Sequence, residues 1–270
     1  MNILFIGYGK TSQHVAKQLF AHGHHIYTIS RSAKTDAFAH HEIQDVHQLH
    51  LCHLPNIDWV YVLLSPDTST VAAYQDTFVD AVRPIISALQ QHNLKRVVVV
   101  SSTRVYGESE GQWIDDDTVI TPVDEQGMCL RQMEQLWLQA YPEQVTIIRP
   151  SGIYGRSVQR MKRLAETTTS YNSIHWSNRI HLDDLVGFLV FLTTLKPQKI
   201  ATAYIVSNSQ PVALHQVLQW FQQQLHLPSL ILQSERYTGK RIFAKRLQDS
   251  GFQLQHPDCF QDYLQLLQNK

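Results

Sequence analysis

The first 30 residues contain a strand, a glycine turn, a helix and a second strand, and this order constrains the fold more than any other feature of the chain. Residues 2–6 form a short apolar run that ends at Gly7, which is typical of a strand buried on both faces. Apolar residues then recur at helical spacing over residues 15–20, Gly23 ends the helix, and residues 25–29 have the pattern of the next strand. A strand–helix–strand unit predicts two parallel neighbouring strands in a Rossmann-type sheet.

The turn between the first strand and the helix has the spacing Gly7-x-Gly9-x-x-Ser12. Gly7 permits a tight turn, Gly9 lets the backbone approach a pyrophosphate, and the small Ser12 replaces the usual third glycine. The helix begins at Lys10 and Thr11, where free N–H groups can bind phosphate oxygens. The turn therefore predicts a dinucleotide site formed by these residues. The alternative is a glycine turn that holds no ligand.

Strands and helices continue to alternate as far as residue 150. We expect a polar loop over residues 106–124, with the following elements around it: strands at 58–64, 97–100 and 145–149, and helices at 71–91, with a kink at Pro84, and at 126–140. This order predicts an α/β fold with a doubly wound parallel sheet. Residues 1–150 should form the dinucleotide-binding Rossmann domain. Residues 151–270 should form a smaller α/β substrate lobe packed on it, with some segments returning to the sheet.

The alternation is looser in the C-terminal part of the chain. We expect the following elements there: a helix over 182–194 that starts at Asp183 or Asp184, a strand over 203–206, a helix over 212–225, a short strand over 230–232 and a helix from Phe260. No internal repeat or low-complexity linker separates them. The C-terminal part is predicted to be a smaller lobe that leans on the carboxyl edge of the sheet.

The second strand ends in Ser30-Arg31-Ser32 and not in an acidic residue. A carboxylate at this place would bind the ribose hydroxyls of NAD, whereas an arginine can pair with the 2′-phosphate of NADP. Arg31 thus favours NADP over NAD, and the alternative is an arginine exposed on a loop. Ser65 and Ser101 follow later strands, so we expect them among the cofactor contacts at the carboxyl ends of the sheet.

The composition excludes several kinds of partner. The chain has 23 basic and 23 acidic residues, so nothing predicts a strong field for nucleic acid or an anionic membrane. The longest apolar stretches are too short to span a bilayer, and the chain opens with a strand-like segment rather than a signal sequence. Three widely spaced cysteines match neither a disulfide framework nor a zinc pattern. We therefore expect a cytoplasmic protein.

Eight of the 15 histidines fall between His22 and His53. Histidines three residues apart, as in 47–53, can share a helix face and bind a metal ion. The alternative is a surface rich in histidine and glutamine. We favour the alternative, and expect no metal, because no Cys or carboxylate completes a familiar ligand spacing.

Four segments together resemble the extended short-chain dehydrogenase/reductase superfamily, in its NAD-dependent epimerase/dehydratase branch. They are G-Y-G-K-T-S at 7–12, V-V-V-V-S-S-T-R-V-Y-G at 97–107, I-I-R-P-S-G-I-Y-G-R at 147–156 and R-I-H-L-D-D-L at 179–185. They occur in the family's order and cover most of the chain. The resemblance implies a Rossmann fold, a nicotinamide dinucleotide and a small polar substrate, with a nucleotide sugar as the default.

The resemblance also implies roles for individual residues. Ser102 matches the active-site Ser/Thr whose hydroxyl holds the substrate oxygen. The dipeptide Arg149-Pro150 matches the segment beside the nicotinamide, and Tyr154 lies where that segment reaches the substrate lobe. In the H-x-D sequence that follows, Asp183 is expected to be structural and to cap a helix.

The Tyr-x-x-x-Lys pair of that family is missing from this chain. Gly127 and Arg131 stand at its positions. Glycine cannot transfer a proton, whereas Arg131 could still hydrogen-bond a ribose as a fixed cationic donor. Any acid–base chemistry then needs another group. The candidates are Tyr106, Tyr154, Glu108 and the carboxylates of residues 115–117; alternatively, the tyrosines pack in the core and the aspartates are solvated.

These observations lead to one leading hypothesis and two alternatives. The leading hypothesis is an NADP-dependent enzyme of the epimerase, dehydratase or reductase type, in which Ser102 orients the substrate. The first alternative is a dinucleotide-binding sensor without turnover, which the loss of the Tyr–Lys pair favours. The second is a scaffold without a cofactor, against which Gly7 and Gly9 argue. Family members often dimerise through two long helices, here 71–92 and 126–140, so the resemblance implies a possible homodimer.

Overall fold

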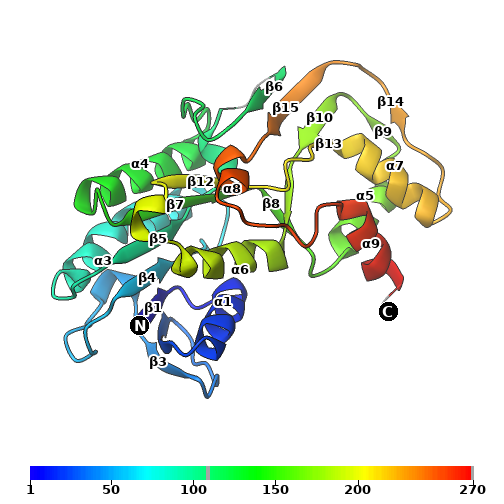
Figure 1. Ribbon diagram of the computed structural model, residues 1–270. Coiled ribbons are helices and arrows are strands. Elements are labelled where there is room, and N and C mark those ends of the chain that lie inside the picture. Colours follow the sequence, from blue (N-terminus) through cyan, green and yellow to red (C-terminus); the bar gives the residue numbers. More distant parts are fainter. Residues whose placement is uncertain (108–109, 269–270) are drawn as a thin grey trace. The chain divides into compact units, whose positions relative to one another are not determined.

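The computed structural model describes residues 1–107 and 110–268. The chain divides into two units and passes between them several times. The first unit comprises Met1–Gly107, Ile120–Arg149 and Val186–Tyr204, and the second comprises the described parts of 108–119, 150–185 and 205–270. Residues 186–204 therefore belong with the N-terminal part of the chain although they come late in the sequence (Figure 1).

A mostly parallel seven-stranded sheet organises the first unit, with the strand order β12-β7-β5-β4-β1-β2-β3. Its strands are β1 (Asn2–Ile6), β2 (His25–Ser30), β3 (Ala39–Ile43), β4 (Trp59–Val62), β5 (Arg96–Val100), β7 (Val145–Pro150) and β12 (Ala203–Val206). From β3 inward the chain order is 3-2-1-4-5, which is the order of doubly wound dinucleotide-binding sheets. The predicted fold class is thus confirmed.

Helices cover both faces of this sheet. Figure 1 shows α3 (Val82–Leu89) and α4 (Glu125–Ala140) on one side, and α1 (Lys10–Ala21) and α6 (Leu182–Phe191) on the other. The residues of β1 from Ile3 to Ile6 are fully buried, as an apolar run covered on both faces must be. Tyr61 on β4 illustrates the packing, because its ring stacks on Phe5 and its hydroxyl donates to the Leu189 carbonyl of α6 at 2.7 Å.

Strand β3 was not predicted from the sequence. Its residues, Ala-His-His-Glu-Ile, include no apolar run, and the strand lies at the sheet edge beside β2. An edge strand with a solvated face does not need the continuous apolar pattern by which the inner strands were found. The strand expected at 58–64 is therefore the fourth in the chain, and it is shorter than expected.

The helix expected over residues 71–91 consists of three parts. These are α2 (Val71–Tyr74), a π-helical turn η2 (Gln75–Asp80) and α3. Pro84, in the first turn of α3, lacks the N–H that would bond to the carbonyl of Asp80, and its ring crowds the preceding turn. The predicted irregularity is thus present one turn before the proline.

A second sheet, with the order β13-β10-β15-β6, belongs to the second unit. Its strands are β6 (Glu110–Ile114), β10 (Ile174–Ser177), β13 (Val212–Ala213) and β15 (Tyr237–Ile242). Strand β6 corrects the expectation of a polar loop over 106–124. It pairs with β15, which is far along the chain, so no local pattern announced it. The helix expected from residue 212 likewise begins as β13.

Three helices enclose the apolar core of the second unit. They are α5 (Gln159–Thr167), α7 (Leu214–Gln224) and α9 (Cys259–Gln268), and their buried side chains include Ala165, Phe221 and Tyr263. The remaining elements are β8 (Gly152–Tyr154), β9 (Ser170–Tyr171), β11 (Arg179–His181), β14 (Ile231–Leu232), α8 (Lys245–Asp249) and short 3-10 turns at Val46–Gln48, Thr103–Val105, Leu192–Thr194 and Pro197–Lys199. Over the described residues, no helix has the length and apolar character needed to cross a membrane.

Candidate cofactor and acid–base sites

The turn after β1 is held in a conformation that requires glycine. Gly7 has a φ of +89°, and a Cβ at this position would lie 2.3 Å from the carbonyl oxygen of Leu63. Its N–H donates to the Ile29 carbonyl at 3.1 Å. The hydroxyl of Ser12, one of the expected cofactor residues, is buried and donates to the Gly7 carbonyl at 2.7 Å. Ser12 therefore fastens the turn from inside.

Gly9 is the N-cap of α1, and no side chain caps this end of the twelve-residue helix. A Cβ at Gly9 would meet no atom within 4 Å. Lys10 and Thr11 form the first turn of the helix, where backbone N–H groups have no partner within the helix. Together with the helix dipole, these donors make the amino end of α1 suitable for an anion such as a pyrophosphate.

A cavity of about 680 Å³ opens beside this turn, at the carboxyl ends of β1, β2, β3 and β4. Of the residues that the sequence indicated, Gly7, Gly9, Arg31 and Ser65 line it. Its other lining residues are Tyr8, Ser30, Ser32, Lys34, Gln44, Asp45, Val46, His47, Leu63, Leu64, Asp76 and Thr77. Sequence reasoning missed those from 44 to 47 because it missed β3. The cavity volume and the uncapped helix end both fit a dinucleotide.

Arg31, the expected partner of a 2′-phosphate, makes a two-pronged ion pair with Asp67. The two nitrogen–oxygen distances are 2.8 and 2.6 Å. Hydrogen bonding between them raises the pKa of the Arg31 guanidinium and lowers the pKa of the Asp67 carboxyl. The side chains are 64% and 70% exposed, so the pair is of the weak, salt-screened kind that a ligand can displace. Lys34 brings a second cation to the cavity wall.

Two serines that follow β5 hold the backbone there. Ser101 is buried, and its N–H donates to the Ile148 carbonyl at 2.7 Å. The hydroxyl of Ser102 accepts from the N–H of Arg104 at 3.2 Å and caps the following 3-10 turn. Accepting this bond leaves the hydroxyl hydrogen of Ser102 as a donor for a further oxygen. The predicted role of Ser102 toward a substrate oxygen is chemically compatible with this arrangement.

Gly127 lies in the first turn of α4, at the position of the missing tyrosine. Its N–H donates to the Asp124 carboxylate at 2.6 Å, and Asp124 also pairs with Arg104 at 3.0 Å. A Cβ on Gly127 would lie 3.0 Å from the Pro122 side chain and 3.1 Å from the Arg104 carbonyl oxygen. The space at the base of a tyrosine side chain is therefore already tight. One turn later, Arg131 approaches Glu134 to 3.5 Å.

Tyr106 belongs to a closed, buried cluster in the first unit. The guanidinium of Arg149 donates to both carboxylate oxygens of Glu134, at 2.9 and 2.8 Å, and to the Tyr106 hydroxyl at 2.9 Å. Burial alone would lower the pKa of Arg149, but its hydrogen bonds to Glu134 reverse this and raise it. Pro150, which follows, ends β7. The contacts of Tyr106 are those of a core residue.

The aspartates of residues 115–117 anchor their loop to other parts of the second unit. Asp116 is buried and accepts from the backbone N–H groups of Ile205 and Arg246, at 2.6 and 2.9 Å, and burial raises its pKa. Asp117 pairs with Lys245 at 3.0 Å, and Asp115 accepts from the N–H of Asp117. These contacts are structural. Glu108, the remaining carboxylate candidate, lies outside the described residues.

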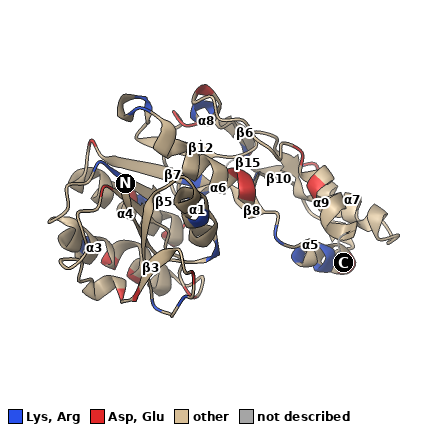
Figure 2. Cartoon of the chain, turned by 60° about the horizontal axis from the view of Figure 1, so that its bottom comes forward, with Lys and Arg blue, Asp and Glu red and all other residues tan. Residues whose placement is uncertain are grey.

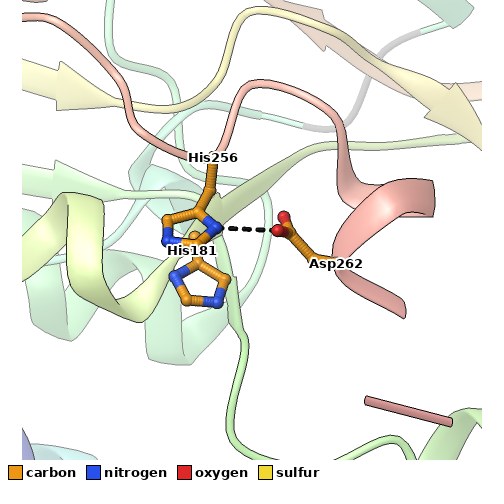
Figure 3. A group of neighbouring side chains, drawn as sticks. All are labelled: His181, His256 and Asp262. Carbon is orange, nitrogen blue, oxygen red and sulfur yellow. Dashed lines mark hydrogen bonds and ion pairs between the residues drawn. The ribbon is translucent and has the colours of Figure 1, made fainter. Parts of the chain in front are cut away.

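Tyr154 lies in a second cluster, which belongs to the second unit. Its hydroxyl donates to one oxygen of Asp262 at 2.5 Å, and the other oxygen of Asp262 is 2.7 Å from Nδ1 of His256. The ring of His181 stacks on that of His256 with 3.7 Å between centroids (Figure 3). Burial, and then the hydrogen bond to Asp262, raise the pKa of Tyr154, so its phenol stays protonated.

The start of α6 differs from the expectation that Asp183 or Asp184 caps it. The N–H of Asp183 donates to Nδ1 of His181 at 3.2 Å, so the imidazole is the capping group. Asp184 is buried and accepts instead from the N–H groups of Gln255 and His256, at 2.7 and 3.0 Å. The carboxylate of Asp183 is largely exposed. Asp184 is thus the aspartate that fixes the second unit.

Helix α5 carries a group of basic residues in the second unit. Figure 2 shows them in blue on this helix. They are Arg160, Lys162 and Arg163, with Arg156 just before the helix. A group of cations on one short segment is suited to a phosphorylated or otherwise anionic ligand.

Comparisons with known proteins agree with this geometry. A stretch of 116 residues is 29% identical to Protein YeeZ of Escherichia coli K12 and covers 43% of this chain, so the chain spans about two fifths of that curated relative (41%). A solved protein from Methylobacillus flagellatus, assigned as an NAD-dependent epimerase/dehydratase, is 31% identical over 99% of this chain and 97% of its own, with a TM-score of 0.81.

The UDP-glucuronic acid 4-epimerase of Bacillus cereus, solved with UDP-glucuronic acid and NAD, has the same fold. It matches 99% of each chain with a TM-score of 0.79 at 16% identity. The family model of the NAD dependent epimerase/dehydratase family matches residues 7–183, which is most of the chain. The strand order, the glycine turn and this match lead to one conclusion: the chain belongs to the NAD-dependent epimerase/dehydratase family.

Proposed function

We propose that this protein is an enzyme that binds a nicotinamide dinucleotide in its first unit and acts on a nucleotide-diphosphate sugar. The observation that carries the proposal is the cavity beside the uncapped amino end of α1, which combines the open space at Gly9 with the strand ends of a doubly wound sheet. Bound there, an oxidised dinucleotide supplies a hydride acceptor. Gly7, Gly9, Lys10 and Thr11 hold the pyrophosphate.

The proposed substrate class rests on a structural neighbour. The Bacillus cereus epimerase, which has the same fold, was solved with UDP-glucuronic acid. In the proposed reaction Ser102 donates to the sugar oxygen at which chemistry occurs. The reaction is an epimerisation, dehydration or reduction.

The form of the cofactor depends on Arg31. A 2′-phosphate must displace Asp67 before it can use the guanidinium, so the gain at the phosphate is offset by the loss of the ion pair. We therefore expect NADPH to bind only a few-fold more tightly than NADH. This is a modest NADP preference, in the direction that the sequence indicated.

A titration of the full-length protein with NADH and, separately, NADPH tests the cofactor site. Reduced-nicotinamide fluorescence, excited through energy transfer from tryptophan, gives both affinities. Micromolar binding, weakened at least tenfold by Gly9→Asp because a carboxylate opposes the pyrophosphate, supports the proposal. A protein that binds neither dinucleotide refutes it. Turnover of UDP-glucuronic acid and UDP-glucose, followed by chromatography, then tests the substrate class.

The tight packing at Gly127 favours a second candidate function, a dinucleotide sensor without turnover. Ser102→Ala separates the two candidates, because it abolishes turnover by an enzyme and leaves the cofactor affinity of a sensor unchanged. The double variant Gly127→Tyr, Arg131→Lys is a further test. If the wild-type protein shows no turnover and the double variant gains none, simple loss of an older active site does not explain why Gly127 and Arg131 stand at these positions.

Two further proposals concern the setting of the protein. The family resemblance suggests a homodimer through the segment 71–92 and α4, and Met128 on α4 is 53% exposed and available for such a contact. Sedimentation of the purified protein tests this. A cytoplasmic location also stays a prediction, which fractionation of the source cells can check.

A further inference from the structure

We propose that His47 controls dinucleotide binding in the first unit: its charged form joins two walls of the cofactor cavity and gives that cavity a net positive charge. The inference rests on the proposed function, since it concerns the same cavity. It adds a dependence on pH that neither the glycine turn nor Arg31 provides. All residues of the argument belong to the first unit. No sequence pattern indicated this role.

His47 lies in the 3-10 turn η1 (Val46–Gln48), which follows β3. Asp45 caps this turn, and its carboxylate accepts from the backbone N–H of His47 at 2.9 Å. The π-helical turn η2, which contains Asp76, supplies another part of the cavity wall. His47, Asp45 and Asp76 all line the cavity of about 680 Å³. The imidazole of His47 therefore bridges two segments of the wall, between residues that are 29 positions apart in the chain.

Both ring nitrogens of His47 face groups that only accept hydrogen bonds. Nδ1 lies 2.9 Å from a carboxylate oxygen of Asp45. Nε2 lies 3.2 Å from the backbone carbonyl oxygen of Asp76 and 3.4 Å from a carboxylate oxygen of the same residue. A neutral imidazole has one N–H and donates on one side only, whereas the imidazolium donates on both sides. The geometry is therefore that of the charged ring, and loss of its proton breaks one of the two connections.

The charge of His47 also determines the net charge of the cavity wall. Over the residues that the structure describes, the wall contains two other cations, Arg31 and Lys34, and two anions, Asp45 and Asp76. These four charges cancel, so the wall is neutral when His47 is neutral and positive when His47 is an imidazolium. A dinucleotide carries a negatively charged diphosphate and is attracted to a positive wall. It should therefore bind more tightly to the protein in which His47 is protonated.

The groups around His47 favour its charged form. The hydrogen bond to Asp45 raises the pKa of His47, and the contacts with Asp76 add to this effect, whereas burial opposes it. In turn, the hydrogen bonds from His47 lower the pKa of Asp45. Arg31, which follows β2, interacts electrostatically with the same two carboxylates. The residues of α3 that line a neighbouring cavity together with His47 carry no charge; they are Pro84, Ser87 and Ala88.

The sign of the pH dependence follows from these contacts. Below the raised pKa of His47 the ring is charged, the two wall segments are joined and the dinucleotide binds tightly. As the pH rises through that pKa, one connection and the net positive charge are lost, so the affinity falls. The side chain of His47 is 32% exposed, so solvent screens the effect. We expect Kd to rise about three- to tenfold, as it would if a bound anion raised the pKa of His47 by about 0.5–1.

Fluorescence titration of the full-length protein with NADH, at pH values from 6 to 9, tests the inference. NADH is the probe because its diphosphate keeps its charge over this range, whereas the additional phosphate of NADPH loses a proton near pH 6. In the wild type, Kd should rise about three- to tenfold with pH. In His47→Gln, Kd should stay close to the high-pH value of the wild type at every pH.

His50→Gln is the matched control. His50 is an exposed histidine three residues further along the chain, and it does not line the cofactor cavity. This variant should keep the pH dependence of the wild type. If Kd depends on pH to the same extent in the wild type and in His47→Gln, another group is responsible and the inference is overturned. A wild-type Kd that is constant over this pH range overturns it as well.

A second measurement decides the inference even if NADH binds at no pH, an outcome that would count against the proposed function alone. The NMR signals of ¹⁵N-labelled histidine rings report the protonation of both nitrogens, and His47→Gln identifies the signals of His47. A midpoint above about 6.5 that inorganic pyrophosphate raises further, and that Asp45→Asn lowers, supports the inference. A midpoint at or below 6.5 overturns it. A midpoint that pyrophosphate leaves unchanged, in a protein that also fails to bind NADH, overturns it too.

Discussion

Two clusters in this molecule are built on the same plan, and they differ in how far they are open to solvent. In the first unit, Glu134 accepts from Arg149, which also bonds to Tyr106. In the second unit, Asp262 accepts from His256 and from Tyr154. Each cluster therefore joins a buried carboxylate to a nitrogen base and a tyrosine hydroxyl.

The difference lies in the base and in its exposure. Arg149 is buried and its guanidinium does not lose its proton in proteins, so the first cluster has a fixed charge and a fixed shape. The base of the second cluster is the imidazole of His256, whose side chain is 26% exposed. The first cluster is thus closed to solvent, whereas the second leaves part of the His256 side chain exposed. The predictions below test this contrast.

The closed cluster should give the largest effect on stability. Glu134→Gln leaves the buried Arg149 without its counter-charge, so we expect it to lower the free energy of unfolding by about 3–5 kcal/mol. Urea denaturation measures this. Arg131→Gln is the control. Arg131 is partly exposed and its contact with Glu134 is long, at 3.5 Å, so this variant should change the free energy of unfolding little. Equal losses in the two variants would show that Arg149 does not depend on Glu134.

Gly7 and Gly9 also differ in how closely they are packed. Gly7→Ala places a methyl group 2.3 Å from a backbone oxygen at a positive φ, so it should destabilise the fold by about 1–3 kcal/mol. Gly9→Ala meets no atom within 4 Å and should leave the unfolding curve unchanged. It should still weaken NADH binding, because the methyl group occupies space next to the cavity. Thermal unfolding and fluorescence titration of both variants check this pair of expectations.

The open cluster should make stability depend on pH. Burial and His256 lower the pKa of His181 in the folded state below its ordinary value of about 6.5, so the unfolded chain binds the proton more readily. The contribution of His181 to the free energy of unfolding is therefore complete at a pH above about 6.5. It decreases as the pH falls from there toward the lowered pKa of the folded state. His181→Asn keeps an acceptor for the N–H of Asp183 but does not titrate. Its urea midpoint should therefore fall less than that of the wild type between pH 8 and pH 5.

The smallest effect is expected at the exposed pair of the cofactor cavity. Asp67→Asn removes the partner of Arg31, so NADPH should bind a few-fold more tightly while NADH affinity stays the same. The ratio of the two affinities, measured at low and at high salt, tests this. An unchanged ratio would mean that Arg31 does not contact the 2′-phosphate. A matched drop in both affinities would point instead to a disturbed loop.

The fold could be predicted because its inner strands are buried on both faces. Such strands must be apolar runs, and β1 and β5 were recognised from that pattern. β3 and β6 were not recognised, because an edge strand with polar residues and a strand paired with a distant segment leave no local signal. The glycine turn was predicted for a comparable reason. A positive φ and a close approach between the turn and another part of the backbone both restrict the residue type to glycine.

Less of the candidate site than of the fold could be predicted from the sequence. The cavity residues from Gln44 to His47 follow the unrecognised β3, so no pattern of residues predicted their place at the sheet edge. The His256–Asp262 pair joins a loop and a helix to residues of β8 and β11 that lie far earlier in the chain. No spacing rule connects such positions. The Tyr154 position was indicated by resemblance, but its bond to Asp262 came only from the structure.

The passage of the chain between the two units has a consequence for synthesis on the ribosome. The seven-stranded sheet receives β12 only after residue 206 has been made, and the carbonyl of Leu189 that bonds to Tyr61 arrives nearly as late. Until then, one edge of β7 and the face of the sheet that α6 covers remain open to water and to other chains. The nascent protein therefore exposes this apolar face of the sheet until α6 has been made, so we expect its yield in cells to depend on protection by chaperones.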